Sequence, residues 1–396
     1  MKENTAAQTE EGLPMATFPE IKNKLTWQRI HAMPKKHAGM TIQEMREICV
    51  AFMRFSKTAL WTPNSEITFI KNAGGTEDKM TPGLVYAGVP YISSATGNVY
   101  RMMDWINEET GVLDLESAMQ YPILFGNQCS GCTYWGGWGR VINSTTQVWT
   151  GAMTQANGFL RVGPYTYRDG LAHYSGEYTT KMICEENGLD VMCRSYARMH
   201  LADGFVNFFT GGHVLMASSE PHVEYTDGKI DPENSYILIS EQGQTWHELT
   251  NEAGDVYQMK NSVDRKMTFQ QLFKQSYIPF TYAEFVGLKD VEETKYGIDL
   301  TGDSVTAAQL FGATVSANYG ISDLYVSLKD AVGKEVYLLI VRADVSGVRK
   351  LAITQEGPTA WAKGNYEALS GSYAVEVRAQ LSTGERPVVY TGTVTV

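Results

Sequence analysis

Hydrophobic residues recur every three or four positions in two segments that begin with the same polar signal. In the first segment, Thr41 and Glu44 have the spacing of a capping box, which predicts a helix start. The apolar side chains that this helix should bury are Met45, Ile48, Phe52 and Phe55. In the second segment, Thr268 and Gln271 begin a shorter helix that we expect to end before Pro279.

Two apolar runs between these helices predict a β-hairpin with a long loop. The run 214–217 follows His213, and the run 236–239 follows a polar, turn-rich stretch. The second strand should end at Glu241 and Gln242, at the level of His213. Because side chains alternate along a strand, these two residues lie on opposite faces. One of them therefore points toward the histidine, and we prefer Glu241.

The last part of the chain changes to short β-rich runs separated by Gly, Asp and Asn turns. The runs lie at 313–315, 324–328, 336–341, 350–353, 373–379 and 388–396. Within one run, Val375 and Val377 alternate with Glu376 and Arg378, as in a half-buried strand. Strands at this spacing predict an antiparallel sandwich of immunoglobulin-like type.

The pattern divides the chain into three segments. Residues 1–25 are polar and lack periodicity, so we expect a tail. Residues 26–290 mix helices with hairpins, which predicts an α+β domain, and residues 291–396 form the sandwich. Since every histidine and cysteine lies before residue 290, and domain interfaces are often modest, a chain cut there should stay folded and thiol-reactive.

Candidate chemistry begins with Cys129 and His213. Cys129 is followed by Ser130 and Gly131, which form a small turn, and by the aromatic segment 134–138, which should anchor a helix. Only a thiolate attacks, and a helix N-terminus or an imidazolium favours it. A histidine supplies the base and later the acid, held in one tautomer by a third polar group. The alternative interpretation is an ordinary buried cysteine.

Four short motifs then follow one another in a recognisable order. They are Gly88-Val89-Pro90-Tyr91, Gln128-Cys129-Ser130-Gly131, Gly212-His213-Val214 and Ser240-Glu241. In this order they resemble the NlpC/P60 and CHAP cell-wall peptidases, which are papain-like. The resemblance covers roughly residues 80–245.

The resemblance implies roles for particular residues. Cys129 becomes the nucleophile, His213 the base and Glu241 the orienting residue. Tyr91 matches a tyrosine that lies near the nucleophile and the oxyanion. Gln128 and Gln242 are further candidates for oxyanion or substrate contacts.

The chain also departs from those families. Gln128 replaces the Asp that commonly precedes the cysteine, and the spacing from His213 to Glu241 is longer than usual. A papain alignment instead makes Cys132 the nucleophile, although Thr133 stands where that pattern has an aromatic residue.

Other cysteines and histidines offer competing interpretations. Cys129 and Cys132 are half of a zinc or redox site if Cys184 and Cys193 supply the other half, but the second pair is spaced too widely for a zinc knuckle. Those two residues are instead a disulfide or two core cysteines. The main rival for the base is His200.

Charge and hydropathy narrow the classes of function. The formal net charge of −11 argues against nucleic acid as a partner. No apolar run is long enough for a transmembrane segment, and the first residues lack the apolar region of a signal peptide. The resemblance implies a secreted or envelope-associated protein whose signal peptide is absent from this sequence. A cytoplasmic protein is the alternative.

These observations together favour a cysteine peptidase or amidase acting on peptidoglycan peptides, with no cofactor and no metal. The C-terminal domain is then a spacer or a contact to the wall or to glycan. Two alternatives remain open: a non-catalytic binding or adhesion protein on a degenerate papain-like scaffold, and a thioester-forming acyltransferase or deamidase.

Overall fold

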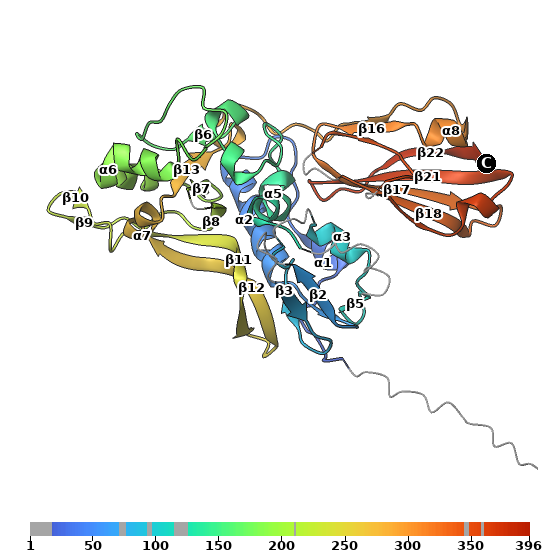
Figure 1. The fold of residues 1–396 in the computed structure, drawn as a ribbon, viewed down its shortest axis with the longest axis horizontal. Coiled ribbons are helices and arrows are strands. Elements are labelled where there is room, and N and C mark those ends of the chain that lie inside the picture. Colours follow the sequence, from blue (N-terminus) through green and yellow to red (C-terminus); the bar gives the residue numbers. More distant parts are fainter. Residues whose placement is uncertain are drawn as a thin grey trace, which may run out of the picture.

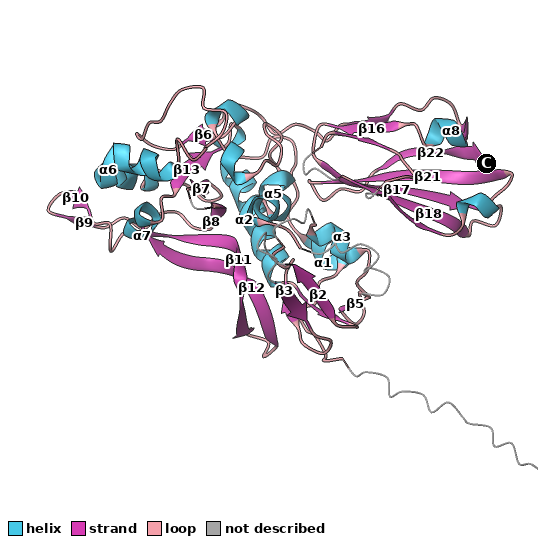
Figure 2. Cartoon of the chain, viewed as in Figure 1, coloured by secondary structure: helices cyan, strands magenta, loops and turns pink. Residues whose placement is uncertain are grey.

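The computed structural model describes residues 18–70, 77–92, 97–114, 126–209, 211–343, 348–357 and 360–396. These residues form a mixed α/β unit and a predominantly β unit that lie side by side (Figure 1). Figure 2 shows that most helices belong to the first unit. No helix in the described ranges combines the length and apolarity needed to cross a membrane.

Both helices predicted from capping boxes are present. Within the described residues, the helices of the first unit are α1 (Trp27–Ala32), α2 (Ile42–Thr58), α3 (Val99–Met103), α5 (Cys129–Gly136), α6 (Thr180–Tyr196) and α7 (Phe269–Lys274), with 3-10 turns η2 (Trp138–Arg140), η3 (Thr150–Ala152), η4 (Gln155–Asn157) and η5 (Glu284–Val286). At the start of α2, the N–H of Thr41 donates to the Glu44 carboxylate at 2.7 Å, and Thr41 Oγ1 accepts from Glu44 N–H at 3.2 Å. Thr268 and Gln271 form the same box before α7. The four predicted apolar side chains of α2 are buried.

A large mixed sheet forms the centre of the first unit. Within the described residues its strands, in spatial order, are β5 (Val112–Leu113), β1 (Leu60–Pro63), β4 (Tyr86–Ala87), β12 (Val256–Thr268), β11 (Tyr236–Thr250), β8 (Gly212–Ala217), β7 (Gly204–Phe208), β13 (Ile278–Thr281) and β6 (Leu160–Arg161). Two small hairpins are β2 (Ile67–Ile70) with β3 (Glu77–Met80), and β9 (Tyr225–Thr226) with β10 (Lys229–Ile230). Side chains from α2, α5 and α6 share one apolar core with β7, β8 and β11.

The predicted hairpin of β8 and β11 is confirmed, but its second strand is longer than expected. The two strands pair antiparallel, with Ile239 opposite Ala217. β11 does not end at Gln242, because it continues to Thr250 and pairs with β12 along most of its length. Residues 244–250 are largely exposed, so they lack the apolar alternation that indicates a strand. The far ends of β11 and β12 project together from the body of the unit (Figure 1).

The polar N-terminal segment ends earlier than predicted. Residues 1–17 lie outside the described residues, but Ile21 and Leu25 are buried, and Leu25 N–H donates to Leu60 O at 2.7 Å. The boundary at residue 25 is therefore wrong. Two apolar side chains four positions apart cover the edge of β1, which a purely compositional argument overlooks.

The second unit consists of two facing sheets. One contains β14 (Tyr296–Ile298), β16 (Thr314–Ala317) and β19 (Lys350–Ala352). The other contains β15 (Ser304–Thr306), β22 (Val388–Thr395), β21 (Ser372–Leu381), β17 (Ile321–Lys329), β18 (Glu335–Arg342) and β20 (Ala360–Lys363). Each predicted β-rich run overlaps one of these strands, and side chains from both sheets fill one apolar core. Short helical turns, α8 (Ala307–Leu310) and η6 (Tyr366–Ala368), lie in the connections.

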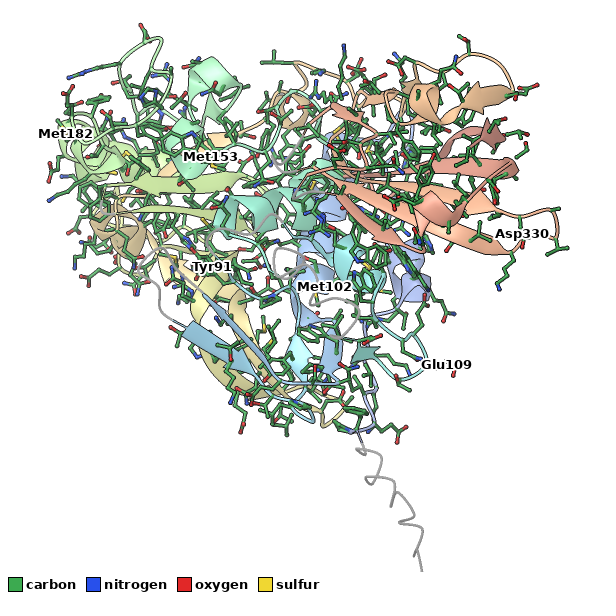
Figure 3. All side chains as sticks on the ribbon, turned by 45° about the vertical axis from the view of Figure 1, so that its right-hand side comes forward. Tyr91, Met102, Glu109, Met153, Met182 and Asp330 are labelled. Atoms are coloured by element: carbon green, nitrogen blue, oxygen red, sulfur yellow. The ribbon has the colours of Figure 1, made fainter. Side chains whose placement is uncertain are left out.

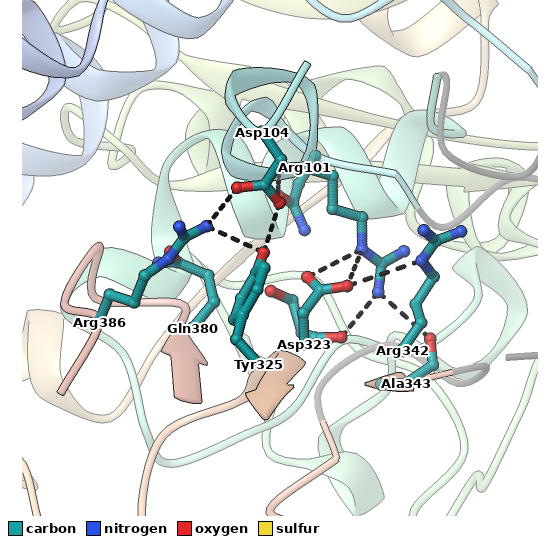
Figure 4. Close-up of polar contacts among 10 residues, drawn as sticks. Arg101, Asp104, Asp323, Tyr325, Arg342, Ala343, Gln380 and Arg386 are labelled. Atoms are coloured by element: carbon teal, nitrogen blue, oxygen red, sulfur yellow. Dashed lines mark hydrogen bonds and ion pairs between the residues drawn. The ribbon is translucent and has the colours of Figure 1, made fainter. Parts of the chain in front are cut away.

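The two units meet through a buried ion-pair cluster (Figure 4). Arg101 of α3 donates through Nε to both carboxylate oxygens of Asp323 in β17, at 2.8 and 3.0 Å. Its NH2 group donates to Ser322 O at 2.8 Å. Arg342 Nε lies 3.6 Å from the same Asp323 carboxylate. The Arg101 and Asp323 side chains keep only 2% and 1% of their surface exposed.

A second cluster adjoins the first. Asp104 accepts hydrogen bonds from the Tyr325 hydroxyl at 2.5 Å and from Arg386 NH2 at 2.8 Å. Arg386 Nε also donates to Gln380 Oε1 at 2.9 Å (Figure 4). Burial raises the pKa of Asp104, and the charge of Arg386 opposes that rise. The carboxylate therefore depends on residues of the second unit.

The same interface reaches the helix that carries Cys129. Tyr134 of α5 is buried, which raises the pKa of its hydroxyl, and Ser382 of the second unit opposes that rise. Gly384 has φ +89°, and a Cβ there would lie 1.9 Å from Arg140 NH1, so the loop after β21 needs glycine. Buried charges therefore cross the interface between the two units. A chain cut near residue 290 loses these partners.

Candidate active site

The start of α5 positions Cys129. Cys129 is the first residue of the helix, after Gln128 with extended backbone. Cys132 N–H donates to Gln128 O at 2.8 Å and closes the first turn. The unpaired amides and the dipole of a helix start favour a thiolate at this position. The predicted aromatic anchor is confirmed, since Tyr134, Trp135 and Trp138 are buried.

The start of β8 brings His213 to the thiol. His213 pairs with Asn207 of β7, which fixes its position along the sheet. Its ring lies close enough to Cys129 for the sulfur to raise the pKa of the imidazole, and Cys129 Sγ lies 3.8 Å from Gly212 O. A Cβ at residue 212 would lie 1.8 Å from Thr150 Oγ1, so the close approach of η3 requires glycine there.

Glu241 lies on β11, the strand next to β8, and its carboxylate contacts His213. Cys129, His213 and Glu241 thus form a row of three side chains. His213 Nε2 lies 2.7 Å from Glu241 Oε2, which leaves Nδ1 as the ring nitrogen available to the thiol. The other carboxylate oxygen, Oε1, accepts a hydrogen bond from Arg265 Nε at 2.9 Å. The His213 and Glu241 side chains are 25% and 12% exposed, so the row is largely shielded from water but open on the histidine side.

These contacts set the charges in the row. Desolvation opposes protonation of His213, but hydrogen bonds and charges from Cys129 and Glu241 outweigh it and raise the pKa of the ring to about 10. Burial likewise opposes ionisation of Glu241, yet His213 and Arg265 hold the pKa of this carboxyl below its usual value. The row therefore places a protonated imidazole beside Cys129.

Tyr91 lies next to this row and reaches the β11–β12 hairpin (labelled in Figure 3). Its backbone bridges to Asn127, and Asn127 N–H donates to Pro90 O at 3.0 Å, which ties the Pro-Tyr segment to the turn before Cys129. Desolvation and the nearby Cys129 raise the pKa of the Tyr91 hydroxyl, while a hydrogen bond with Gln244 opposes the rise. The hydroxyl therefore stays protonated and can donate.

The two glutamines have different positions. Gln128 is partly exposed, and its side chain does not cap α5, so it is accessible beside the thiol. Gln242 is fully buried; its Nε2 donates to Val89 O at 2.8 Å and its Oε1 accepts from Lys57. The prediction that Gln242 contacts substrate is wrong, because β11 turns this side chain into the core.

Two charged residues of the site were not found from the sequence. Lys57, in the last turn of α2, is 1% exposed and donates to Asn261 Oδ1 at 3.1 Å as well as to Gln242. Helical spacing puts Lys57 on the same helix face as Cys49 and Met53, and this placement on an apolar face could have indicated that the lysine is buried. Arg265 was missed because β12, which carries it, was not recognised as the partner of β11.

The competing residues lie elsewhere. His200 has a 61% exposed side chain that pairs with Glu220 at 3.0 Å, so it does not serve Cys129. Cys132 is buried and contacts Lys57 rather than His213, which contradicts the papain alignment. Cys184 and Cys193 are free and buried, so they are core cysteines rather than a disulfide. Among the described residues, no three His, Cys, Asp or Glu side chains gather as metal ligands.

Comparisons with protein-family models, with curated proteins and with solved structures find no match for this chain. What the site can do chemically therefore follows from its own residues. A thiol at a helix start, a histidine held by a carboxylate and a nearby tyrosine hydroxyl together suit acyl transfer through a thioester.

Proposed function

We propose that this chain is a cysteine peptidase or amidase with Cys129 as nucleophile, His213 as base and Glu241 as orienting residue. The observation that carries the proposal is the continuous row from the Cys129 thiol through His213 to Glu241, with a 2.7 Å bond between the last two. We assign the first unit to the papain-like α+β class and the second to the immunoglobulin-like sandwiches.

The chemistry assigned to the row has two halves. The Cys129 thiolate attacks the carbonyl carbon, and the carbonyl oxygen becomes an oxyanion that accepts from the Cys129 N–H and the Tyr91 hydroxyl. The C–N bond then breaks as the His213 imidazolium donates its proton to the leaving amine. Neutral His213 next takes a proton from water, which attacks the thioester and releases the acid and the thiolate.

The substrate class in this proposal rests on the resemblance to cell-wall peptidases. We assign the chain to peptide bonds of bacterial peptidoglycan, in a secreted or envelope-associated protein, with no cofactor in the reaction. The buried interface between the two units supports a structural role for the sandwich, since Asp323 of β17 pairs with Arg101 of α3. Any contact with the wall or with glycan would then be made by the surface of the sandwich that faces away from the first unit.

Incubation of the chain with purified peptidoglycan tests this proposal. We expect paired new amino and carboxyl termini in the released fragments, and mass spectrometry locates the cleaved bond. An added primary amine separates hydrolysis from acyl transfer, because a transferase yields an amide in place of the new carboxyl terminus. If no peptide or amide bond in the polymer changes while Cys129 remains alkylatable, the proposed hydrolase function is wrong.

Substitution of Glu241 by glutamine should change the pH profile as well as the rate. His213 must be protonated to protonate the leaving amine, so its pKa of about 10 in the substrate-free chain sets the alkaline limb of kcat/KM. Removing the Glu241 charge lowers that pKa, and the limb should move to lower pH. We expect kcat to fall by about 10²- to 10⁴-fold with little change in KM. An unshifted limb would remove Glu241 from the mechanism.

A further inference from the structure

Two buried thiols, Cys129 and Cys132, lie on the first turn of α5. Cys129 is the first residue of the helix and Cys132 the fourth, and residues three apart share a helix face. Negative charge on Cys129 raises the pKa of the Cys132 thiol, and charge on either sulfur raises the pKa of Lys57. Cys129 is 5% exposed and Cys132 1% exposed, so an oxidant that enters the site meets Cys129 first.

The amino group of Lys57 lies against the sulfur of Cys132. An ammonium has three donors. In this site they face Gln242 Oε1, Asn261 Oδ1 and the sulfur of Cys132. Burial raises the pKa of the Cys132 thiol, and the charge and hydrogen bond of Lys57 counteract that rise. The cation therefore stabilises a thiolate at Cys132 at the moment when it forms.

The surroundings leave room for the Cys132 sulfur to move. A void of about 10 Å³ adjoins Cys132 and Lys57 and is also lined by Asn127 and Trp135. Asn127 Oδ1 is buried there and makes no hydrogen bond within the described residues. A slot of this size accommodates at most about one water, so a small rotation of the Cys132 side chain meets little resistance.

We propose that Cys129 and Cys132 form a reversible disulfide when a hydroperoxide enters the site, which switches off the hydrolase. The switching role rests on the proposed function, whereas the disulfide itself needs only a reactive Cys129. No ligand, metal or second protein takes part, and the hydroperoxide is the sole oxidant.

The two steps balance with one hydroperoxide. The Cys129 thiolate attacks the terminal peroxide oxygen, an S–O bond forms, the O–O bond breaks, and the departing hydroxide or alkoxide takes a proton from His213. The product is Cys129 sulfenic acid. The Cys132 thiolate then attacks that sulfur, the S–S bond forms, and the S–O bond breaks. The leaving hydroxide takes up the proton that Cys132 gave up, so two thiols and one peroxide give a disulfide and two hydroxylic products.

The position at the helix start makes closure feasible and keeps it reversible. Side chains three apart on a helix have Cβ atoms about 5–6 Å apart, whereas a disulfide needs roughly 3.5–4.5 Å. The first turn must therefore loosen, and the bond from Cys132 N–H to Gln128 O is the one that gives way. Strain of this kind raises the reduction potential, so a mild thiol should reopen the disulfide.

Mass spectrometry of the full chain treated with one equivalent of hydrogen peroxide tests the inference. After alkylation of free thiols, the peptide that spans Cys129 and Cys132 should appear unalkylated and lighter by two hydrogens. Dithiothreitol should restore both alkylation sites. A wild-type chain that instead keeps one oxygen at Cys129 as sulfenic acid, trapped by dimedone, with Cys132 still alkylatable, overturns the inference.

Substitution of Cys132 by serine removes the resolving thiol, and substitution of Cys193 by serine is the matched control at another buried, free cysteine. In the Cys132→Ser chain, peroxide should leave irreversible sulfinic acid at Cys129, while the Cys193→Ser chain should behave as wild type. If Cys132→Ser fails to fold, Lys57→Met provides a second test. Without the cation the Cys132 thiolate forms less readily, so sulfenic acid at Cys129 should persist longer, as measured by dimedone trapping. Equal trapping in wild type and Lys57→Met would count against the role of the cation.

The proposed hydrolase and the disulfide can fail separately. If the chain forms the disulfide but cleaves no peptidoglycan bond, the disulfide is supported. The switching role then fails together with the proposed function. A chain that cleaves peptidoglycan but accumulates no disulfide overturns the present inference alone.

Discussion

Replacing Cys129 with alanine is expected to lower kcat for peptide-bond hydrolysis by about 10⁴- to 10⁶-fold, because no other thiol contacts His213 in the described residues. Rapid alkylation by iodoacetamide near pH 6 should disappear in the same variant. Fast alkylation at that pH requires a thiolate stabilised by its surroundings, and the helix start with His213 provides this at Cys129. Peptide mapping of the alkylated chain is the direct measurement.

Cys193→Ala is the appropriate control for that experiment, since Cys193 is also free and buried but lies in α6. It should keep both the hydrolysis rate and the fast alkylation. A Cys129→Ala chain that still cleaves at more than about one hundredth of the wild-type rate would mean that Cys129 is not the nucleophile. A wild-type chain without any fast-reacting cysteine would instead favour the binding-protein alternative.

Replacing Asp323 with alanine is expected to lower the free energy of unfolding by about 3–5 kcal/mol, because it removes the carboxylate that faces Arg101 and Arg342. All three side chains are at most 5% exposed, so water cannot take over the role of the carboxylate. The loss should appear in urea denaturation of the full chain as a lower midpoint. Near-UV circular dichroism of the native variant should stay close to wild type.

Glu376→Ala tests whether that effect belongs to the interface. Glu376 pairs with Arg378 within the second unit at 2.7 Å, but both side chains are partly exposed, at 25% and 42%. Such a pair contributes about 0.5 kcal/mol or less. If Asp323→Ala costs no more than Glu376→Ala, the two units are joined by something other than these charges.

The sequence predicted the parts of the fold that rest on local rules. The capping boxes at Thr41 and Thr268 fix helix starts through hydrogen bonds within four residues, so they can be recognised without tertiary information. The same holds for Cys129 at a helix start. Strand alternation narrowed the partner of His213 to Glu241 or Gln242, and the structure confirms the preferred Glu241.

What the sequence did not predict depends on partners far along the chain. Lys57 is buried because Gln242 and Asn261 accept from it, and a lysine near a helix end normally indicates an exposed residue. Arg101 and Asp323 are separated by 222 residues, and each is an ordinary charged residue by local standards. They become a buried pair only where the two units contact each other, and the hydrophobic periodicity of the sequence does not predict that contact.

The buried charges between α3 and β17 also bear on how such a chain can diversify. A β-sandwich that meets its neighbour through exposed residues can be exchanged between proteins as a module. Here a transplanted sandwich that lacks a carboxylate at the Asp323 position removes the ion-pair partner of the buried Arg101, while a transplanted α/β unit that lacks Arg101 removes one of the two arginines that face Asp323. We therefore expect the two units to be inherited together, with substitutions at Arg101 and Asp323 occurring as a pair.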